Sequence, residues 1–173
     1  MPFDAAVVAQ HARAIETAPW FAATGLPFSD DERRALAELA PRIARVGGWA
    51  QARAVADDAR ANAAYDADAR EAAALKAQAE SAAGSPAVLR ALSAVVDEGL
   101  PVFFGCAEAA LARAGLHDEE LSRVAAGAVG EAVYRAALAA ATAHPAHRFI
   151  GVAAAYAIGR WPLARIDDVL YML

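Results

Sequence analysis

The residues best suited to chemistry in this sequence are two histidines three positions apart, His144 and His147, with Arg148 beside the second. Imidazole nitrogens bind transition metals and transfer protons near neutral pH, so the pair could converge on a ligand. No glutamate stands three residues before a histidine, which is the spacing that carboxylate-bridged metal sites in helical bundles use. The alternative is structural, with His144 capping a helix end and His147 solvated. We therefore predict no metal site and no cofactor.

The single cysteine is the next candidate. Cys106 follows Phe103, Phe104 and Gly105. If a helix begins near Pro101, Cys106 lies within its first two turns, where the helix dipole favours a thiolate nucleophile. A cysteine among Phe, Gly and Ala is more often a small buried hydrophobic residue. The sequence offers no glycine-rich phosphate loop and no Gly-x-Ser-x-Gly elbow, so catalysis is not the leading hypothesis.

Charge and composition argue against several partners. The net charge is −5, Lys76 is the only lysine, and basic and acidic residues are interspersed along the chain. Nucleic acids bind clustered positive charge, so we expect no nucleic-acid binding. No segment combines a basic face with bulky apolar residues, and no uncharged stretch approaches the ~20 residues that span a bilayer, so we expect no membrane association. The start of the chain does not resemble a signal peptide, and the expected location is the cytoplasm.

The elements that position these residues are predicted to be helices. Apolar residues recur at spacings of three and four, no alternating strand pattern is evident, and 173 residues suit one domain. Ser29 and Glu32 form a capping box at the start of a predicted helix. Pro41 lies inside that helix and should kink or split it. The predicted class is an all-α, single-domain bundle (1–173) of about six to eight helices. The expected helices span about 4–17, 30–46, 49–83, 85–99, 101–114, 118–144, 146–159 and 163–173.

The stretch 49–83 is rich in alanine and has no Gly or Pro inside it. It predicts one long helix, or two with a weak joint. Small residues recur along one side at spacings of three and four, forming a narrow seam of Ala52, Ala56, Ala59, Ala63 and Ala67. The seam packs either inside the domain or against a second copy of the chain, so a homodimer through this helix is one hypothesis.

A cluster of large apolar residues stands in a predicted loop, where such residues are unusual. It contains Trp20, Phe21 and Phe28. Either these side chains fold back over the core or they form an exposed patch that binds a protein partner.

Two functions remain. The leading hypothesis is a non-enzymatic helical protein–protein interaction domain, such as an adaptor, accessory or immunity-type binder. The alternative is a small-molecule-binding or enzymatic helical domain with a pocket between the C-terminal helices. That pocket would be lined by Phe103, Phe104, Cys106, Tyr134, His147 and Tyr156.

Overall fold

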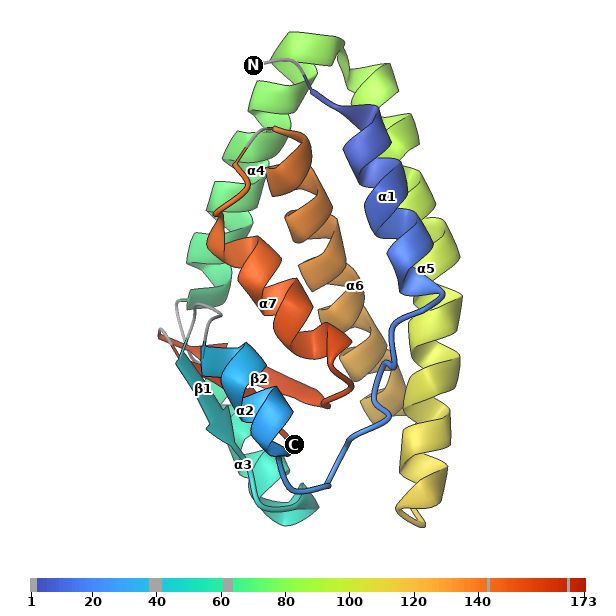
Figure 1. Ribbon diagram of the computed structural model, residues 1–173, viewed down its shortest axis with the longest axis vertical. Coiled ribbons are helices and arrows are strands. Elements are labelled where there is room, and N and C mark those ends of the chain that lie inside the picture. Colours follow the sequence, from blue (N-terminus) through green and yellow to red (C-terminus); the bar gives the residue numbers. More distant parts are fainter. Residues whose placement is uncertain (1–2, 38–41, 61–63, 143, 168) are drawn as a thin grey trace.

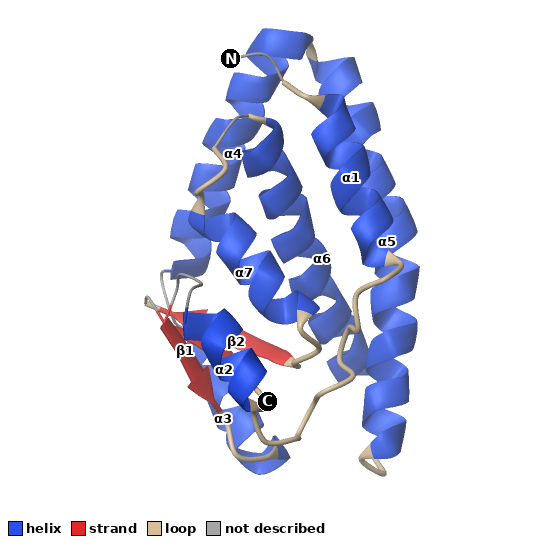
Figure 2. Cartoon of the chain, in the orientation of Figure 1, coloured by secondary structure: helices blue, strands red, loops and turns tan. Residues whose placement is uncertain are grey.

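The computed structural model describes residues 3–37, 42–60, 64–142, 144–167 and 169–173. These ranges hold helices and three short strands (Figures 1 and 2). In chain order the elements are α1 (Ala5–Ile15), α2 (Asp30–Ala37), β1 (Arg42–Arg45), α3 (Trp49–Arg60), α4 (Ala64–Ala83), α5 (Ser85–Arg113), α6 (Glu119–Ala141), α7 (Arg148–Ala157), β2 (Pro162–Ile166) and β3 (Val169–Met172). The predicted bundle of six to eight helices is confirmed, and a small sheet not predicted from the sequence lies at one end.

Helix α6 is the centre of the bundle. It packs against α1, α4, α5 and α7 (Figure 1). Its second half is buried on most sides, and most of the buried residues there are alanines. Small side chains bury little apolar area each, but they let neighbouring helices approach closely and pack densely. The bundle therefore gathers around a helix whose small side chains let its neighbours approach closely.

Polar side chains define several helix starts as predicted. Asp4 accepts a hydrogen bond from the Ala6 amide at the start of α1, and Asp118 accepts one from the Leu121 amide at the start of α6. Before α2, the Glu32 amide donates to Ser29 Oγ at 3.2 Å, and the Ser29 amide donates to Glu32 Oε2 at 2.7 Å. These bonds satisfy amides that have no partner inside the helix.

One predicted break is absent. The expected helices 85–99 and 101–114 form one continuous helix, α5, which passes through Gly99 and Pro101. Pro101 is exposed, so the carbonyl that its missing N–H leaves unpaired faces the solvent side of the helix. Gly99 is buried, and its missing side chain leaves room for the ring of Phe103 and for Ile15. The glycine here serves packing rather than termination.

Replacing Gly99 with Ala is expected to lower the free energy of unfolding by about 1–3 kcal/mol, because it overfills the core. A Cβ at this position would lie 2.9 Å from Phe103 Cε2 and 3.0 Å from Ile15 Cδ1, and both side chains are buried. The matched control is Gly105→Ala on the same helix, where the added Cβ has open space around it. This control should gain up to about 1 kcal/mol in helix propensity. Urea unfolding compares the two, and similar effects would contradict the packing role.

The alanine-rich stretch forms two described helices, α3 and α4, and residues 61–63 lie outside the described residues. Ala52 is buried and Ala67 is exposed. Ala63 and the side chains of Ala56 and Ala59 lie outside what is described, so the homodimer through this seam remains a prediction.

The end of the chain corrects the expected helix 163–173. It forms a hairpin, in which β2 pairs antiparallel with β3, and β1 pairs with β3 in parallel on the other side. Leu170 and Met172 are buried while Val169 and Tyr171 are half-buried, which is the alternation of a strand. Asp167, in the turn, has a φ of 53°, a conformation that tight hairpin turns use.

The expected helix 30–46 is also corrected. Helix α2 ends at Ala37, before Pro41, and the chain continues as β1. The Val46 amide donates to the Met172 carbonyl at 2.8 Å, which extends the pairing of β1 with β3. The predicted effect of Pro41 lies outside the described residues, and the segment after it is extended because β3 offers it a strand edge to pair with.

Candidate functional site

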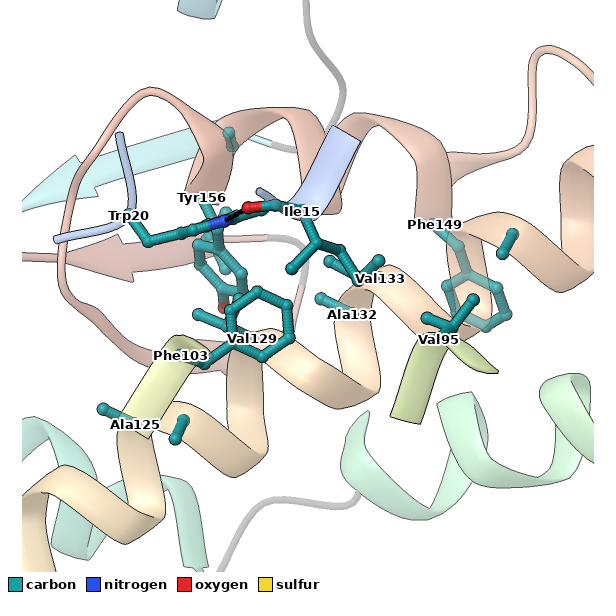
Figure 3. Packing of buried hydrophobic residues seen from close by; sticks show 14 of the residues in the cluster. Ile15, Trp20, Val95, Phe103, Ala125, Val129, Ala132, Val133, Phe149 and Tyr156 are labelled. Atoms are coloured by element: carbon teal, nitrogen blue, oxygen red, sulfur yellow. Dashed lines mark hydrogen bonds between the residues drawn. The ribbon is translucent and has the colours of Figure 1, made fainter. Parts of the chain in front are cut away.

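The aromatic loop between α1 and α2 belongs to the core. Trp20 and Phe21 are buried, and the Trp20 indole donates to the Ile15 carbonyl at 2.7 Å. Trp20 packs edge-on against Phe103, with ring centroids 5.0 Å apart, and Phe21 packs against Trp161 (Figure 3 shows Trp20 and Phe103). The structure therefore has the first alternative, in which the loop folds over the core. Trp20 and Phe21 form no exposed partner-binding patch, and Phe28 is half-buried.

Arg160 holds this loop in place. Its guanidinium is buried, pairs with the Glu32 carboxylate at 2.7–3.0 Å and lies over the ring of Phe28. It also donates to the carbonyls of three loop residues, Ala23, Leu26 and Pro27. Burial raises the pKa of Glu32, but hydrogen bonds from Ser29 and Arg160 lower it by more, so it lies below its usual value. The pair is a structural brace with its donors occupied.

The six residues proposed for a pocket lie in different environments. Phe103 and Tyr156 are buried in the core (Figure 3), and three others are half-buried at its edge: Phe104, Cys106 and Tyr134. Phe104 and Cys106 stand two positions apart on α5, so they project about 200° apart around the helix axis. Burial raises the pKa of Tyr134; of the two charged residues of α4 near it, Lys76 opposes this shift and Glu80 adds to it. Phe104 and Cys106 therefore do not face one common point, and the pocket between the C-terminal helices stays a prediction.

His147 has a role that the sequence did not reveal. Its Nδ1 accepts a hydrogen bond from the Phe149 amide at 3.3 Å and caps α7. Since Nδ1 accepts, the neutral ring carries its proton on Nε2, which lies 2.9 Å from Glu71 Oε1. Glu71 is the carboxylate partner that sequence spacing did not identify. His144 instead lies 3.2 Å from the Thr142 hydroxyl, and the two histidine rings are 6.2 Å apart.

Glu71 belongs to a larger group of charges that we call the Asp68 cluster. It joins α4, α6, α7 and β2 and contains Asp68, Glu71, Glu131, Arg135, Arg148 and Arg165. Asp68 is its centre and is only 7% exposed. Asp68 Oδ1 lies 2.5 Å from Arg165 Nη1 and 2.7 Å from Arg148 Nη1, and Oδ2 lies 3.6 Å from Arg135 Nη1. One carboxylate thus holds three guanidinium groups together.

The rest of the Asp68 cluster balances its charge. Glu131 lies 2.5 Å from Arg135, and Glu71 pairs with Arg148. Burial and the negative charge of Asp68 raise the pKa of Tyr156, although Arg135 and Arg165 oppose the shift, so its hydroxyl stays protonated. Three arginines and three carboxylates leave no net charge, and the ions come from four elements. Such a group orients these elements relative to one another.

Within the described residues, no group of three or more His, Cys, Asp or Glu side chains has an arrangement that could hold a metal ion. The prediction of no metal or cofactor itself stays untested.

A second feature lies on the surface, which we call the α5–α6 face. It consists of Leu100 and Phe104 of α5 and of Val124 and Gly127 of α6. Leu100 is 39% exposed and Val124 52%. Leu100 Cδ2 would lie 3.1 Å from a Cβ at Gly130, so α5 and α6 are in close contact where this face begins. Val124 and Gly127 are three positions apart on α6 and lie on the same side of it, whereas Leu121 points to the side of α6 away from α5.

The α5–α6 face lies beyond the part of α5 and α6 that α4 covers. Helices α4 and α5 meet at the turn at Gly84 and diverge from there (Figure 1). Close to that turn, α4 contacts both α5 and α6 and buries Ala72, Leu75 and Ala79. Farther along, where α4 has moved away from α5, large apolar side chains of both α5 and α6 are exposed.

Helix α6 is the one described helix that is long and apolar enough to cross a membrane, judged by length and composition. In its 18-residue apolar window, 67% is buried inside the bundle. A helix whose apolar surface is already covered by neighbouring helices is typical of the core of a soluble protein.

The chain matches no protein-family model, no curated protein and no solved structure.

Proposed function

We propose that this chain is a non-enzymatic helical protein-binding domain of the cytoplasm, and that it binds its partner through the α5–α6 face. The observation that carries the proposal is the exposure of Leu100 on α5 and of Val124 on α6, two helices that pack against each other. Single exposed apolar residues are ordinary, but a cluster on adjacent helices is typical of an interaction surface.

The described charged groups support a binding role rather than catalysis. Arg160 and the Asp68 cluster join separate elements of the fold, and their charged groups are paired with one another. His147 uses both ring nitrogens, one for the cap of α7 and one for Glu71. These contacts make a rigid scaffold, and a rigid scaffold presents a surface at low entropic cost on binding.

Replacing Leu100 and Val124 together with Ser is expected to weaken partner binding at least tenfold, because both side chains lose apolar contact area. The immobilised chain first captures a partner from an extract of its source cells, and calorimetry then titrates the purified partner against wild type and variant. Val124 is 52% exposed, but Leu100 is 39% exposed and packs on Gly130, so the melting temperature should fall modestly and binding is measured well below it.

The matched control is Leu26→Ser, at a leucine that is 56% exposed in the loop before α2. It should bind as wild type does. A purified partner that binds the Leu100→Ser/Val124→Ser variant with unchanged affinity would show that the α5–α6 face is not the binding surface.

A further inference from the structure

We propose, on the basis of the binding role above, that the occupant of the α5–α6 face is an amphipathic α-helix of another protein with Lys and Arg along its flanks. This helix would lie against α5 and α6, beyond the part of them that α4 covers. The proposal rests on three observations: the packing of α4, the space at Gly127 and the acidic residues around the face.

Helix α4 shows what α5 and α6 accept. It lies against α5 and α6 with Ala72, Leu75 and Ala79 buried, at spacings of three and four. These are positions on one side of a helix, and two of the three residues are alanines that let the helix axes come close. The surface of α5 and α6 that α4 covers therefore accepts one side of a helix, and the same two helices continue beyond α4.

The part beyond α4 has room for a helix to approach. A Cβ added at Gly127 would have no heavy atom within 4 Å, and Gly127 is exposed. Val124 stands one turn before this glycine on α6, and Leu100 of α5 contacts Gly130 just after it. Along α6 the stretch from Leu121 to Glu131 is about 15 Å long at 1.5 Å per residue, which matches roughly three turns of a bound helix.

The charges around the face predict the flanks of the partner. Asp97 and Glu108 are exposed on α5, and Glu119 and Glu120 are exposed at the start of α6. Glu131, which is half-buried, ends the face beside the Asp68 cluster.

The basic residue in this stretch of α6, Arg123, pairs with both Glu119 and Glu120. The rim is therefore net negative, and a helix with positive flanks complements it.

Two synthetic helical peptides test this inference. Both repeat the Ala-x-x-Leu-x-x-x-Ala spacing of α4 on one side; one carries Lys on both flanks and the other carries Glu. Fluorescence anisotropy of labelled peptide measures Kd for wild type, for Leu100→Ser/Val124→Ser, for Asp97→Lys/Glu108→Lys and for the Leu26→Ser control. Native mass spectrometry of the chain alone, at low and high concentration, reports whether a second copy occupies the face.

The Lys peptide should bind wild type and Leu26→Ser equally, and at least tenfold more weakly to each double variant. Its binding should weaken as salt increases, and the Glu peptide should bind at least tenfold more weakly. Equal binding of the two peptides, still dependent on Leu100 and Val124, would overturn the charge inference and leave the proposed function standing.

Other results would reject helix docking more completely. One such result is that neither peptide binds, while a purified natural partner still requires Leu100 and Val124. The face would then recognise another kind of structure. A dimer that is lost in the Leu100→Ser/Val124→Ser variant would mean that the occupant is a second copy of this chain. Whether the natural partner uses the face at all is judged separately, by the calorimetry described above.

Discussion

Replacing Arg160 with Met will lower the free energy of unfolding by about 3–5 kcal/mol, because it leaves the Glu32 carboxylate without its buried partner. Arg160 is 1% exposed, and its guanidinium also donates to the carbonyls of Ala23, Leu26 and Pro27. Met fills a similar volume but offers no donors. Urea unfolding at neutral pH measures the change, and Arg160→Lys should fall between wild type and Met because it keeps the charge without the planar fork.

The control for Arg160 is Arg123→Met, at an exposed ion pair on α6 where no measurable loss of unfolding free energy is expected.

The pH dependence of the unfolding free energy provides a second readout. The pKa of Glu32 is below its usual value of 4.5, so its ionisation stabilises the fold above that pH and the contribution is lost as the pH falls further. The difference between wild type and Arg160→Met should therefore shrink below pH 4.5. Two results would show that Arg160 does not brace the loop. One is a loss of unfolding free energy equal to that of Arg123→Met; the other is a difference between wild type and Arg160→Met that stays the same in acid.

Replacing Asp68 with Asn will also lower the free energy of unfolding by about 3–5 kcal/mol. The amide keeps the shape of the side chain but removes the charge that three guanidinium groups face. Two buried nitrogens of the cluster, Arg148 Nη1 and Arg165 Nε, make no hydrogen bond of suitable geometry among the described residues, although Asp68 Oδ1 lies 2.7 Å from Arg148 Nη1. The nearby negative charge of Asp68, rather than a hydrogen bond, therefore stabilises these two groups in the fold.

A double-mutant cycle tests the assignment to charge. Arg165→Met in the Asp68→Asn background should cost less than in wild type, because Arg165 has then already lost its carboxylate at 2.5 Å. The surface control is Asp97→Asn, at an exposed position of α5, where little change is expected. Strictly additive effects of Asp68→Asn and Arg165→Met would contradict the proposed coupling.

Local sequence signals predicted much of the helical framework. Asp4, Asp118 and the Ser29–Glu32 box are found at helix starts because a side-chain oxygen can satisfy the first free amides of a helix wherever the helix packs. The ends of α6 and α7 were also near their predicted positions. These features depend on neighbours within a few residues, so the sequence contains the information needed to predict them.

The strands were missed because their stability is not local. Segment 42–45 forms β1 only through its pairing with β3, whose residues are at the far end of the chain. A short apolar run has no periodicity that separates a strand from a helix turn, and its pairing partner decides between them. The same reason explains why Gly99 continues a helix, since its neighbours Phe103 and Ile15 come together only in the folded core.

The sequence by itself determined the class of the protein, a helical bundle built from many small apolar side chains, because helix propensity and apolar spacing are local properties. Only the tertiary structure decided which residues are available for function. It buried Trp20 and Phe21, joined Glu71 to His147 and Arg148, and left Leu100 and Val124 exposed. Exposure and ion pairing depend on which helix covers which face, and that is settled by the packing of segments far apart along the chain.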